Sequence, residues 1–160
     1  MKKISINVPI EVYESAAELM PYEQDLTQAA EEACKTAYAP FSKFRVGAAV
    51  LLENGKVITG SNQENAAYPS GLCAERVALF YANAQYPDTP VKAIAIAASN
   101  ANGFIETPVA PCGACRQVML QTELRFGAAY DILLVGKQAI NKLKSCKDLL
   151  PLTFEGKELI

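Results

Sequence analysis

The hydrophobic and polar positions of this chain change period several times, which indicates strands and helices in alternation. Arg45 to Leu52 alternates toward a turn at Glu53-Asn54-Gly55, and Lys56 to Ser61 continues the pattern after it. Two such runs joined at Asn-Gly predict a β-hairpin. Val91 to Ala98 and Tyr130 to Val135 are continuous apolar runs of strand length. Such runs are typical of strands in a sheet that is covered on both faces.

Helical spacing of apolar residues predicts a first helix over Glu23 to Ala37, which Pro40 would end. Near the N-terminus, Ile4, Ile6 and Val8 alternate with polar residues, which indicates a short edge strand or an ordered arm. We expect Asn100 to Val109 to form a loop. Further helices are predicted over Cys73 to Ala84, Cys112 to Leu124 and, as a short last helix, Lys144 to Leu150. The alternation predicts an α/β fold, a three-layer α/β/α sandwich with a mixed central sheet.

Length and composition predict a single globular domain without a polyanionic partner. The 160 residues are 51% hydrophobic and carry a formal net charge of −2. Lys and Arg are scattered, so we expect no nucleic acid to bind. Ser5, Asn7 and Pro9 interrupt the apolar run that a signal peptide would need, and no segment approaches the roughly 18 apolar residues of a membrane span. A cytoplasmic location with reduced thiols is therefore expected, without a membrane partner.

Three of the five cysteines stand in two motifs that predict a zinc site. These are Cys73-Ala-Glu75-Arg76 and Pro-Cys112-Gly-Ala-Cys115-Arg. A closed structural site needs a fourth protein ligand, but the chain has no histidine, and Cys34 and Cys146 lie outside any ligand pairing. Three thiolates would leave the fourth zinc position open to a water molecule.

The neighbours of these cysteines fit catalysis at such a site. Cys112 and Cys115 share one helical face, and a helix start favours thiolate over thiol. Glu75 is placed to take a proton from the water and pass it to a substrate, while zinc lowers the pKa of that water. Because zinc with three thiolates carries a net negative charge, we expect Arg76 to donate hydrogen bonds to the ligand sulfurs.

Both motifs resemble those of the cytidine deaminases, in particular the small homotetrameric class with three cysteine ligands, within the cytidine and deoxycytidylate deaminase superfamily. The similarity includes Phe41 to Ala48 and Asn62 to Tyr68. It implies a Zn²⁺ cofactor and hydrolytic deamination of cytidine and deoxycytidine to uridine and deoxyuridine. It also implies one catalytic domain over residues 23–160 after an N-terminal extension of residues 1–22, and a homotetramer with shared active sites.

The resemblance also implies roles for single residues in a nucleoside site. Asn62 and Glu64 would hold the ribose hydroxyl, and Phe44 would pack on the pyrimidine face. Glu75 and the backbone of Ala74 would contact the base. The two residues expected to help shape the site are Tyr68 and, from a neighbouring subunit, Phe154. The chain departs from the family pattern in its first 20 or so residues, at Ala110 and after Phe154.

Other interpretations of the cysteines remain open at this point. The group could be a structural zinc site or a redox dithiol, and the protein could be a zinc-binding module without activity. As a deaminase it could act on another small base or nucleoside, including an antibiotic nucleoside, or on a polynucleotide. A carboxylate at Glu64 that binds a ribose 3′-hydroxyl would repel a 3′-phosphate, which disfavours the polynucleotide.

Overall fold

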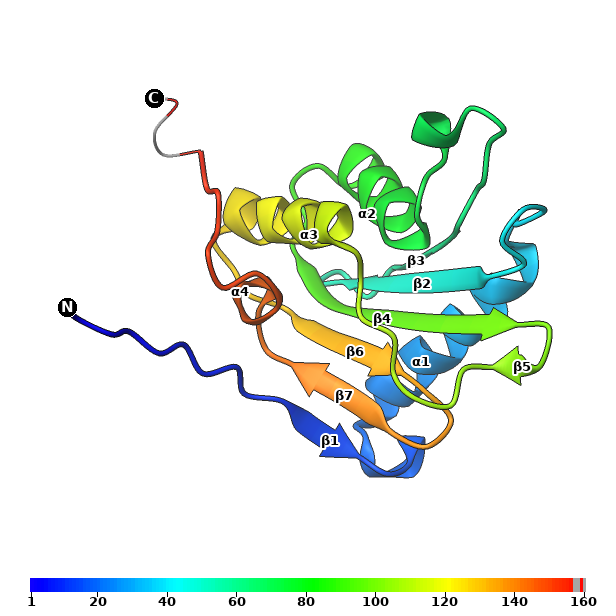
Figure 1. Ribbon diagram of the computed structural model, residues 1–160, viewed down its shortest axis with the longest axis horizontal. Helices are drawn as coiled ribbons and strands as arrows, with labels where there is room; N and C mark the ends of the chain where they lie inside the picture. The colour runs from blue at the N-terminus through cyan, green and yellow to red at the C-terminus, as the bar shows by residue number, and fades with distance from the viewer. Residues whose placement is uncertain (157–158, 160) are drawn as a thin grey trace.

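A mixed seven-stranded sheet between helices forms the frame of the molecule in the computed structural model, which describes residues 1–156 and 159 (Figure 1). The strands are β1 (Glu11–Tyr13), β2 (Arg45–Leu52), β3 (Val57–Ser61), β4 (Val91–Asn100), β5 (Gly103–Phe104), β6 (Asp131–Val135) and β7 (Ile140–Leu143). The helices are α1 (Pro21–Ala33), α2 (Ala74–Gln85), α3 (Gly113–Phe126) and α4 (Cys146–Leu149), with short 3-10 turns at Ala16–Glu18, Cys34–Thr36 and Tyr68–Ser70. The strand order is β1-β7-β6-β4-β2-β3, with β5 paired to β4. Strands β4 and β6 are parallel, and the other pairs are antiparallel.

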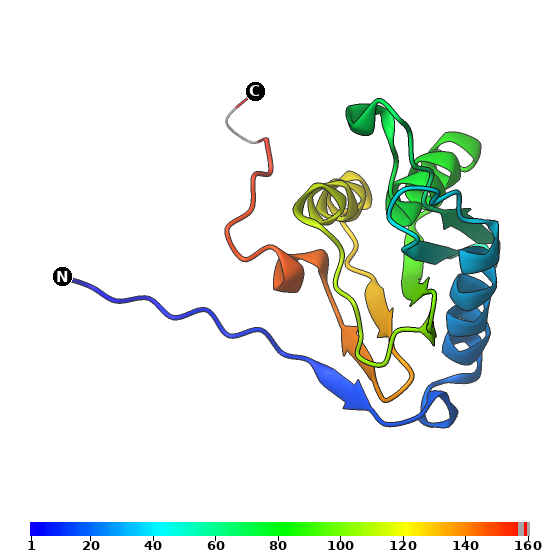
Figure 2. The same ribbon diagram turned by 45° about the vertical axis from the view of Figure 1, so that its right-hand side comes forward.

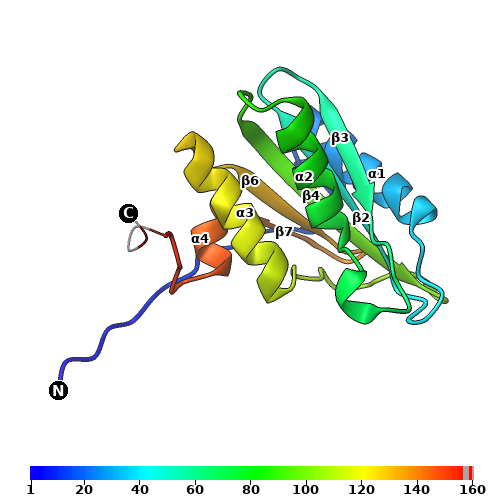
Figure 3. The same ribbon diagram turned by 90° about the horizontal axis from the view of Figure 1, so that it is seen from above.

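The helices cover both faces of the sheet and create two hydrophobic cores. Helix α1 lies on one face, and α2, α3 and α4 lie on the other (Figures 2 and 3). Ile94 and Ile96 of β4 belong to the core beneath α2 and α3, whereas Ala93 and Ala95 belong to the core beneath α1. The continuous apolar run of β4 is thus explained by burial on both faces. The predicted three-layer α/β/α sandwich is confirmed.

The predicted hairpin and the predicted helices are present, and the ends of the helices are shifted. Strands β2 and β3 pair in antiparallel fashion across a turn in which Gly55 has φ +81°. Helix α1 begins at Pro21, before the expected start, because a proline at the first helical position gives up no hydrogen bond. It ends at Ala33, and a 3-10 turn replaces the predicted last turn. The ends of α2, α3 and α4 lie within a few residues of the prediction.

Besides β1, strands β5 and β7 were not predicted. Strand β5 lies inside the segment expected to be a loop, and its two residues are too few for a periodic pattern. Strand β7 has the sequence Ile-Asn-Lys-Leu, in which Lys142 is only 5% exposed. A lysine is rarely buried unless it is paired, so these four residues carry no strand signal of their own.

The N-terminal residues form an arm rather than the alternative edge strand at Ile4 to Val8. Residues 1–10 have no regular secondary structure, and the first strand is β1, which pairs with β7. Pro9 has no N–H, so this part of the arm lacks one backbone donor for pairing within the sheet. The division into an extension of residues 1–22 and a domain of residues 23–160 stays a prediction, and residues 157, 158 and 160 lie outside the described part. Among the described residues, no helix has the length and apolar character to cross a lipid bilayer.

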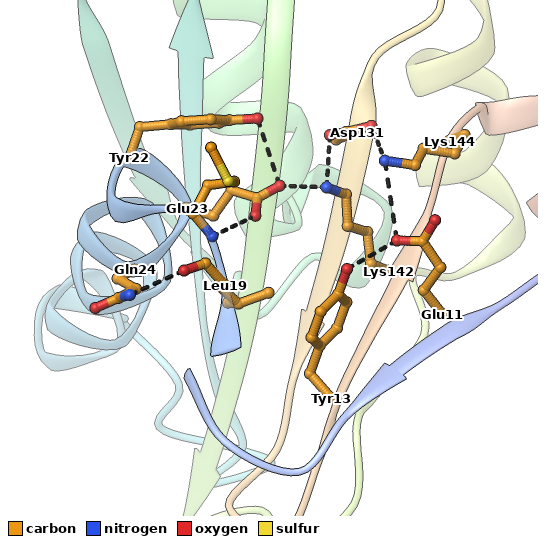
Figure 4. Close-up of polar contacts among 10 residues, drawn as sticks. Glu11, Tyr13, Leu19, Tyr22, Glu23, Gln24, Asp131, Lys142 and Lys144 are labelled. Atoms are coloured by element: carbon orange, nitrogen blue, oxygen red, sulfur yellow. Dashed lines mark hydrogen bonds and ion pairs between the residues drawn. The ribbon is translucent and has the colours of Figure 1, made fainter. Parts of the chain in front are cut away.

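A buried ion-pair cluster joins α1 to the strands at the β1 edge (Figure 4). The Lys142 ammonium group pairs with the Glu23 carboxylate and lies 2.9 Å from Oδ2 of Asp131. Glu23 is 1% exposed and also accepts a hydrogen bond from the Met20 amide at 3.0 Å, at the start of α1. The cluster fixes the register of this helix against β6 and β7. Breaking one side of it would leave a buried charge without a partner.

We expect Lys142→Ala to lower the free energy of unfolding by about 3–5 kcal/mol, because Glu23 would stay buried and lose its cation. Lys144→Ala is the matched control, since Lys144 is 55% exposed in its side chain and lies 3.5 Å from the same Asp131. The control should lose at most about 1 kcal/mol. Urea unfolding followed by circular dichroism measures both, and equal losses in the two variants would contradict the role of the buried pair.

Candidate active site

Two helix starts bring three cysteine sulfurs together on the face of the sheet that carries α2 and α3. Cys73 is the N-cap of α2 and Cys112 is the N-cap of α3, with Cys115 in the first turn of the latter helix. All three sulfur atoms lie within 4.8 Å of one another, and the Cys112 and Cys115 sulfurs are 3.5 Å apart. Backbone N–H groups and the positive dipole ends of both helix starts favour negative charge at this point.

The close approach of α2 to the sheet depends on a glycine. A Cβ atom added at Gly60 of β3 would lie 2.6 Å from the backbone nitrogen of Ala78 and 2.7 Å from the carbonyl oxygen of Ala74. Any other residue would therefore push away the helix that begins with Cys73 and Glu75. The position of one ligand and of the adjacent carboxylate thus depends on backbone contact between α2 and β3.

The sulfur cluster fits a zinc ion. Tetrahedral zinc with bonds of about 2.3 Å places its sulfur ligands about 3.8 Å apart, close to the spacing found here. The Arg76 guanidinium provides compensating charge, with one terminal nitrogen 3.7 Å from the Cys73 sulfur. Its Nε atom is buried and has no hydrogen-bond partner among the described residues. The chain has no histidine, so the donor set has three thiolates and a fourth position without a histidine ligand.

The charges at the cluster indicate a site that attracts a cation. The pKa of Cys73 is lowered to about 5, first by a hydrogen bond with Cys115 and then by Arg76, against the effect of burial. The pKa of Cys115 is raised, first by its hydrogen bond to Cys73 and then by burial. One thiolate therefore accepts hydrogen bonds from its neighbours. A zinc ion would replace those protons and allow all three sulfurs to ionise.

Glu75 lies beside the cluster and is shielded from solvent. Its side chain follows two residues after Cys73, in the first turn of α2, and the residue is 5% exposed. Burial raises the pKa of Glu75, and the Cys73 charge adds to this effect. A carboxyl group with a raised pKa is suited to accept and return a proton near neutral pH.

A cavity of about 750 Å³ opens next to the cluster and is lined by residues from four segments of the chain. Eight predicted site residues line it, namely Phe44, Asn62, Glu64, Tyr68, Cys73, Glu75, Arg76 and Cys112. Ala74 and Cys115 are fully buried and do not line it. Phe154 lies elsewhere, 57% exposed, with its carbonyl oxygen 2.9 Å from the Gln117 side-chain nitrogen. Within one chain, Phe154 therefore contributes nothing to the cavity.

The two residues expected to bind ribose also hold the segment before β2. Asn62 Oδ1 accepts a hydrogen bond from the Val46 amide at 2.7 Å, and its Nδ2 donates to the Phe44 carbonyl at 3.0 Å. Glu64 accepts from the amides of Phe41 at 2.8 Å and Ser42 at 3.3 Å. Hydrogen bonds from Ser42 and Phe41 lower the pKa of Glu64, so its carboxylate is charged.

Sequence reasoning missed several apolar walls of the cavity. Ile96 and Ala98 of β4 and Val109 before α3 line it, together with Phe41. The Phe41 ring meets the Tyr68 ring edge to face, with centroids 6.0 Å apart. Phe41 lies inside a segment that carried the resemblance, which was the one available signal. Ile96 and Ala98 gave no such signal, because the sequence pattern of a strand cannot separate a side chain that faces the core from one that faces a cavity.

The two other cysteines take no part in the site, as expected. Cys34 and Cys146 are buried in the two cores. Burial raises the pKa of Cys34 to about 11 and raises that of Cys146 as well. Both thiols are therefore protonated and unreactive at neutral pH.

Known proteins are similar to this chain over the region that carries the site. Residues 20–126 match the family model described as "Cytidine and deoxycytidylate deaminase zinc-binding region", which spans both cysteine motifs. A cytidine deaminase of Halalkalibacterium halodurans is 48% identical over 98 residues, 61% of this chain and 70% of that protein. A probable cytidine deaminase of Dictyostelium discoideum is 36% identical over 132 residues, 82% of this chain and 83% of that protein.

Solved structures agree with the sequence comparison. The crystal structure of cytidine deaminase from Burkholderia pseudomallei has a TM-score of 0.70 at 40% identity, over 85% of this chain and 100% of that chain. The corresponding structure from Mycobacterium tuberculosis has a TM-score of 0.61 at 30% identity, over 84% and 98%. With its three cysteine sulfurs at two helix starts and a buried glutamate beside them, the chain belongs to the cytidine and deoxycytidylate deaminase family of zinc-binding enzymes.

Proposed function

We propose that this enzyme hydrolyses cytidine and deoxycytidine to uridine and deoxyuridine with release of ammonia. The observation that carries the proposal is the placement of Glu75, which is buried beside three convergent thiols and lines a cavity large enough for a nucleoside. A structural zinc site needs neither a cavity nor a buried carboxylate. The non-enzymatic zinc module is therefore the weaker alternative.

Cys73, Cys112 and Cys115 hold the zinc ion in this proposal. When bound, zinc supplies a Lewis acid that lowers the pKa of a water molecule. Glu75 accepts a proton from that water and transfers it to the base as oxygen adds at C4 and the amine leaves as ammonia. The Ala74 backbone and Glu75 orient the base. Arg76 withdraws charge from the sulfurs, with its guanidinium 3.7 Å from Cys73.

Cavity residues other than the cysteines, Glu75 and Arg76 recognise the rest of the substrate. Phe44 packs on the pyrimidine face, and Tyr68 closes the wall beside it. Asn62 and Glu64 meet the ribose 3′-hydroxyl, since Glu64 is charged and faces the cavity. The same charge repels a 3′-phosphate, and the chain has a net charge of −2. The substrate is therefore a free nucleoside and not a polynucleotide.

We further propose that the enzyme is a homotetramer in which Phe154 reaches the active site of a neighbouring subunit. The exposure of this residue outside its own cavity supports such an arrangement. The enzyme acts in the cytoplasm in pyrimidine salvage, without a nucleic acid or membrane partner.

An ultraviolet assay with a panel of nucleosides, on protein with stoichiometric zinc, tests the proposed reaction. Cytidine and deoxycytidine should lose absorbance with equimolar release of ammonia. Turnover of neither nucleoside would refute the proposal, and turnover of a different base alone would replace the substrate.

We expect Cys112→Ala to lose zinc, because two thiolates bind the ion far more weakly than three. Cys34→Ala is a matched control that removes a thiol outside the cluster, and it should keep the metal. Elemental analysis of purified protein measures zinc per chain. Stoichiometric zinc in Cys112→Ala would contradict ligation by this residue.

Glu75→Gln should keep its zinc and lower kcat by about 10² to 10⁴, because the amide cannot accept the proton of the water. Steady-state kinetics together with metal analysis measure the two effects separately. More than a tenth of the original kcat in zinc-loaded variant protein would exclude Glu75 as the proton carrier.

Glu64→Gln should lower kcat/KM for cytidine by about tenfold or more, because a charge-assisted hydrogen bond to the 3′-hydroxyl is lost. The loss should be within about twofold for 2′,3′-dideoxycytidine, which lacks that hydroxyl. The original enzyme should not deaminate cytidine 3′-monophosphate. Equal losses on both nucleosides would show that Glu64 acts only by holding the amides of Phe41 and Ser42.

A further inference from the structure

The N-terminal arm, residues 1–10, presents a row of apolar side chains to solvent. It leaves the body at β1 and extends away from it in all three views (Figures 1, 2 and 3). Ile4, Ile6, Val8 and Ile10 are 39% to 81% exposed, and Val12 of β1 continues the row at 63%. Residues two apart in an extended chain share one face, so these side chains form a single apolar face.

This arm lies at an open edge of the sheet and outside the catalytic family region. The family match begins at residue 20. Strand β1 ends the strand order and pairs with β7 alone within the described residues, which leaves its outer backbone edge unpaired. An extended apolar edge of this kind invites pairing with another strand.

We infer that the arms of two copies of this chain pair with each other as an antiparallel two-stranded ribbon around a two-fold axis at Asn7. In this register Ile4 lies opposite Ile10 of the partner subunit, and Ile6 lies opposite Val8 of the partner subunit. Lys3 lies opposite Glu11 of the partner subunit on the other face of the ribbon. The apolar side chains of the two arms thus lie on the same face of the ribbon and contact one another, as a two-fold interface requires.

The charges of the arm specify the direction and the register of the pairing. A parallel pair would place Lys3 beside Lys3 of the partner subunit and Glu11 beside its own copy, which is unfavourable. A slip of one residue would place apolar side chains opposite polar ones. A slip of two residues toward β1 would place Lys2 opposite Glu14 of the partner subunit. Glu14 lies beyond the end of that strand. Glu11 is available, since its side chain is 49% exposed, although it accepts a hydrogen bond from Tyr13 and lies 3.9 Å from Lys144.

Cross-linking of the unmodified sequence tests the pairing directly. Light and ¹⁵N-labelled protein are mixed at equal amounts, exchanged to equilibrium and treated with a zero-length carbodiimide, which couples amines to carboxylates. We expect links between Lys3 and Glu11 in which one peptide is light and the other heavy. The eight residue steps from Lys3 to Glu11 span roughly 26 Å in an extended chain, so a link within one arm is excluded. Lys3 links confined to peptides of one isotope, or to other acidic residues, would overturn the inference.

Two variants that exchange the charges of Lys3 and Glu11 test the pairing a second time. Lys3→Glu alone and Glu11→Lys alone should each weaken arm association about tenfold in sedimentation velocity, and an equimolar mixture of the two should restore it. Lys2→Glu is the control, because it makes the same charge change on the opposite face and Glu11→Lys should not rescue it. Failure of the mixture to restore association would also overturn the inference. Deamination is not the readout, so the arm pairing and the proposed reaction can fail independently.

Discussion

The convergence of two helix starts on one point is the constraint on which the rest of the site depends. Cys73 caps α2 and Cys112 caps α3, so the positive ends of both helices face the same sulfur cluster. That arrangement requires α2 to lie against β3 at Gly60, where a Cβ atom would clash with the helix backbone. The thiolates, the arginine beside them and the buried Glu75 all follow from the placement of these two helices.

The cavity illustrates how one set of hydrogen bonds can serve both structure and recognition. Asn62 and Glu64 bind the backbone of the segment from Phe41 to Val46, so they hold the part of the chain that carries Phe44. They also line the cavity together with Cys73 and Cys112. A nucleoside placed there would meet groups already held in position, which reduces the ordering cost of binding.

Local patterns predicted most of the fold, and distant partners determine the remainder. The hairpin, β4, β6 and the two site helices have signals within their own residues, and the cysteine spacing predicted the metal cluster. Strand β7 had no such signal, because the buried Lys142 depends on Asp131 of β6 and on Glu23, which lies 119 residues away. Ile96 and Ala98 were predicted as strand residues but not as cavity wall, since that depends on where Val109 and Phe41 lie. That Phe154 lies outside its own cavity was implied only by the family resemblance, which assigned this ring to a neighbouring subunit.

X-ray absorption at the zinc edge of the purified enzyme can show whether three thiolates hold zinc and leave one position for a reacting water. We expect three sulfur scatterers at about 2.3 Å and one oxygen or nitrogen scatterer at about 2.0 Å. A shell of four sulfurs would mean a closed structural site without a position for the water.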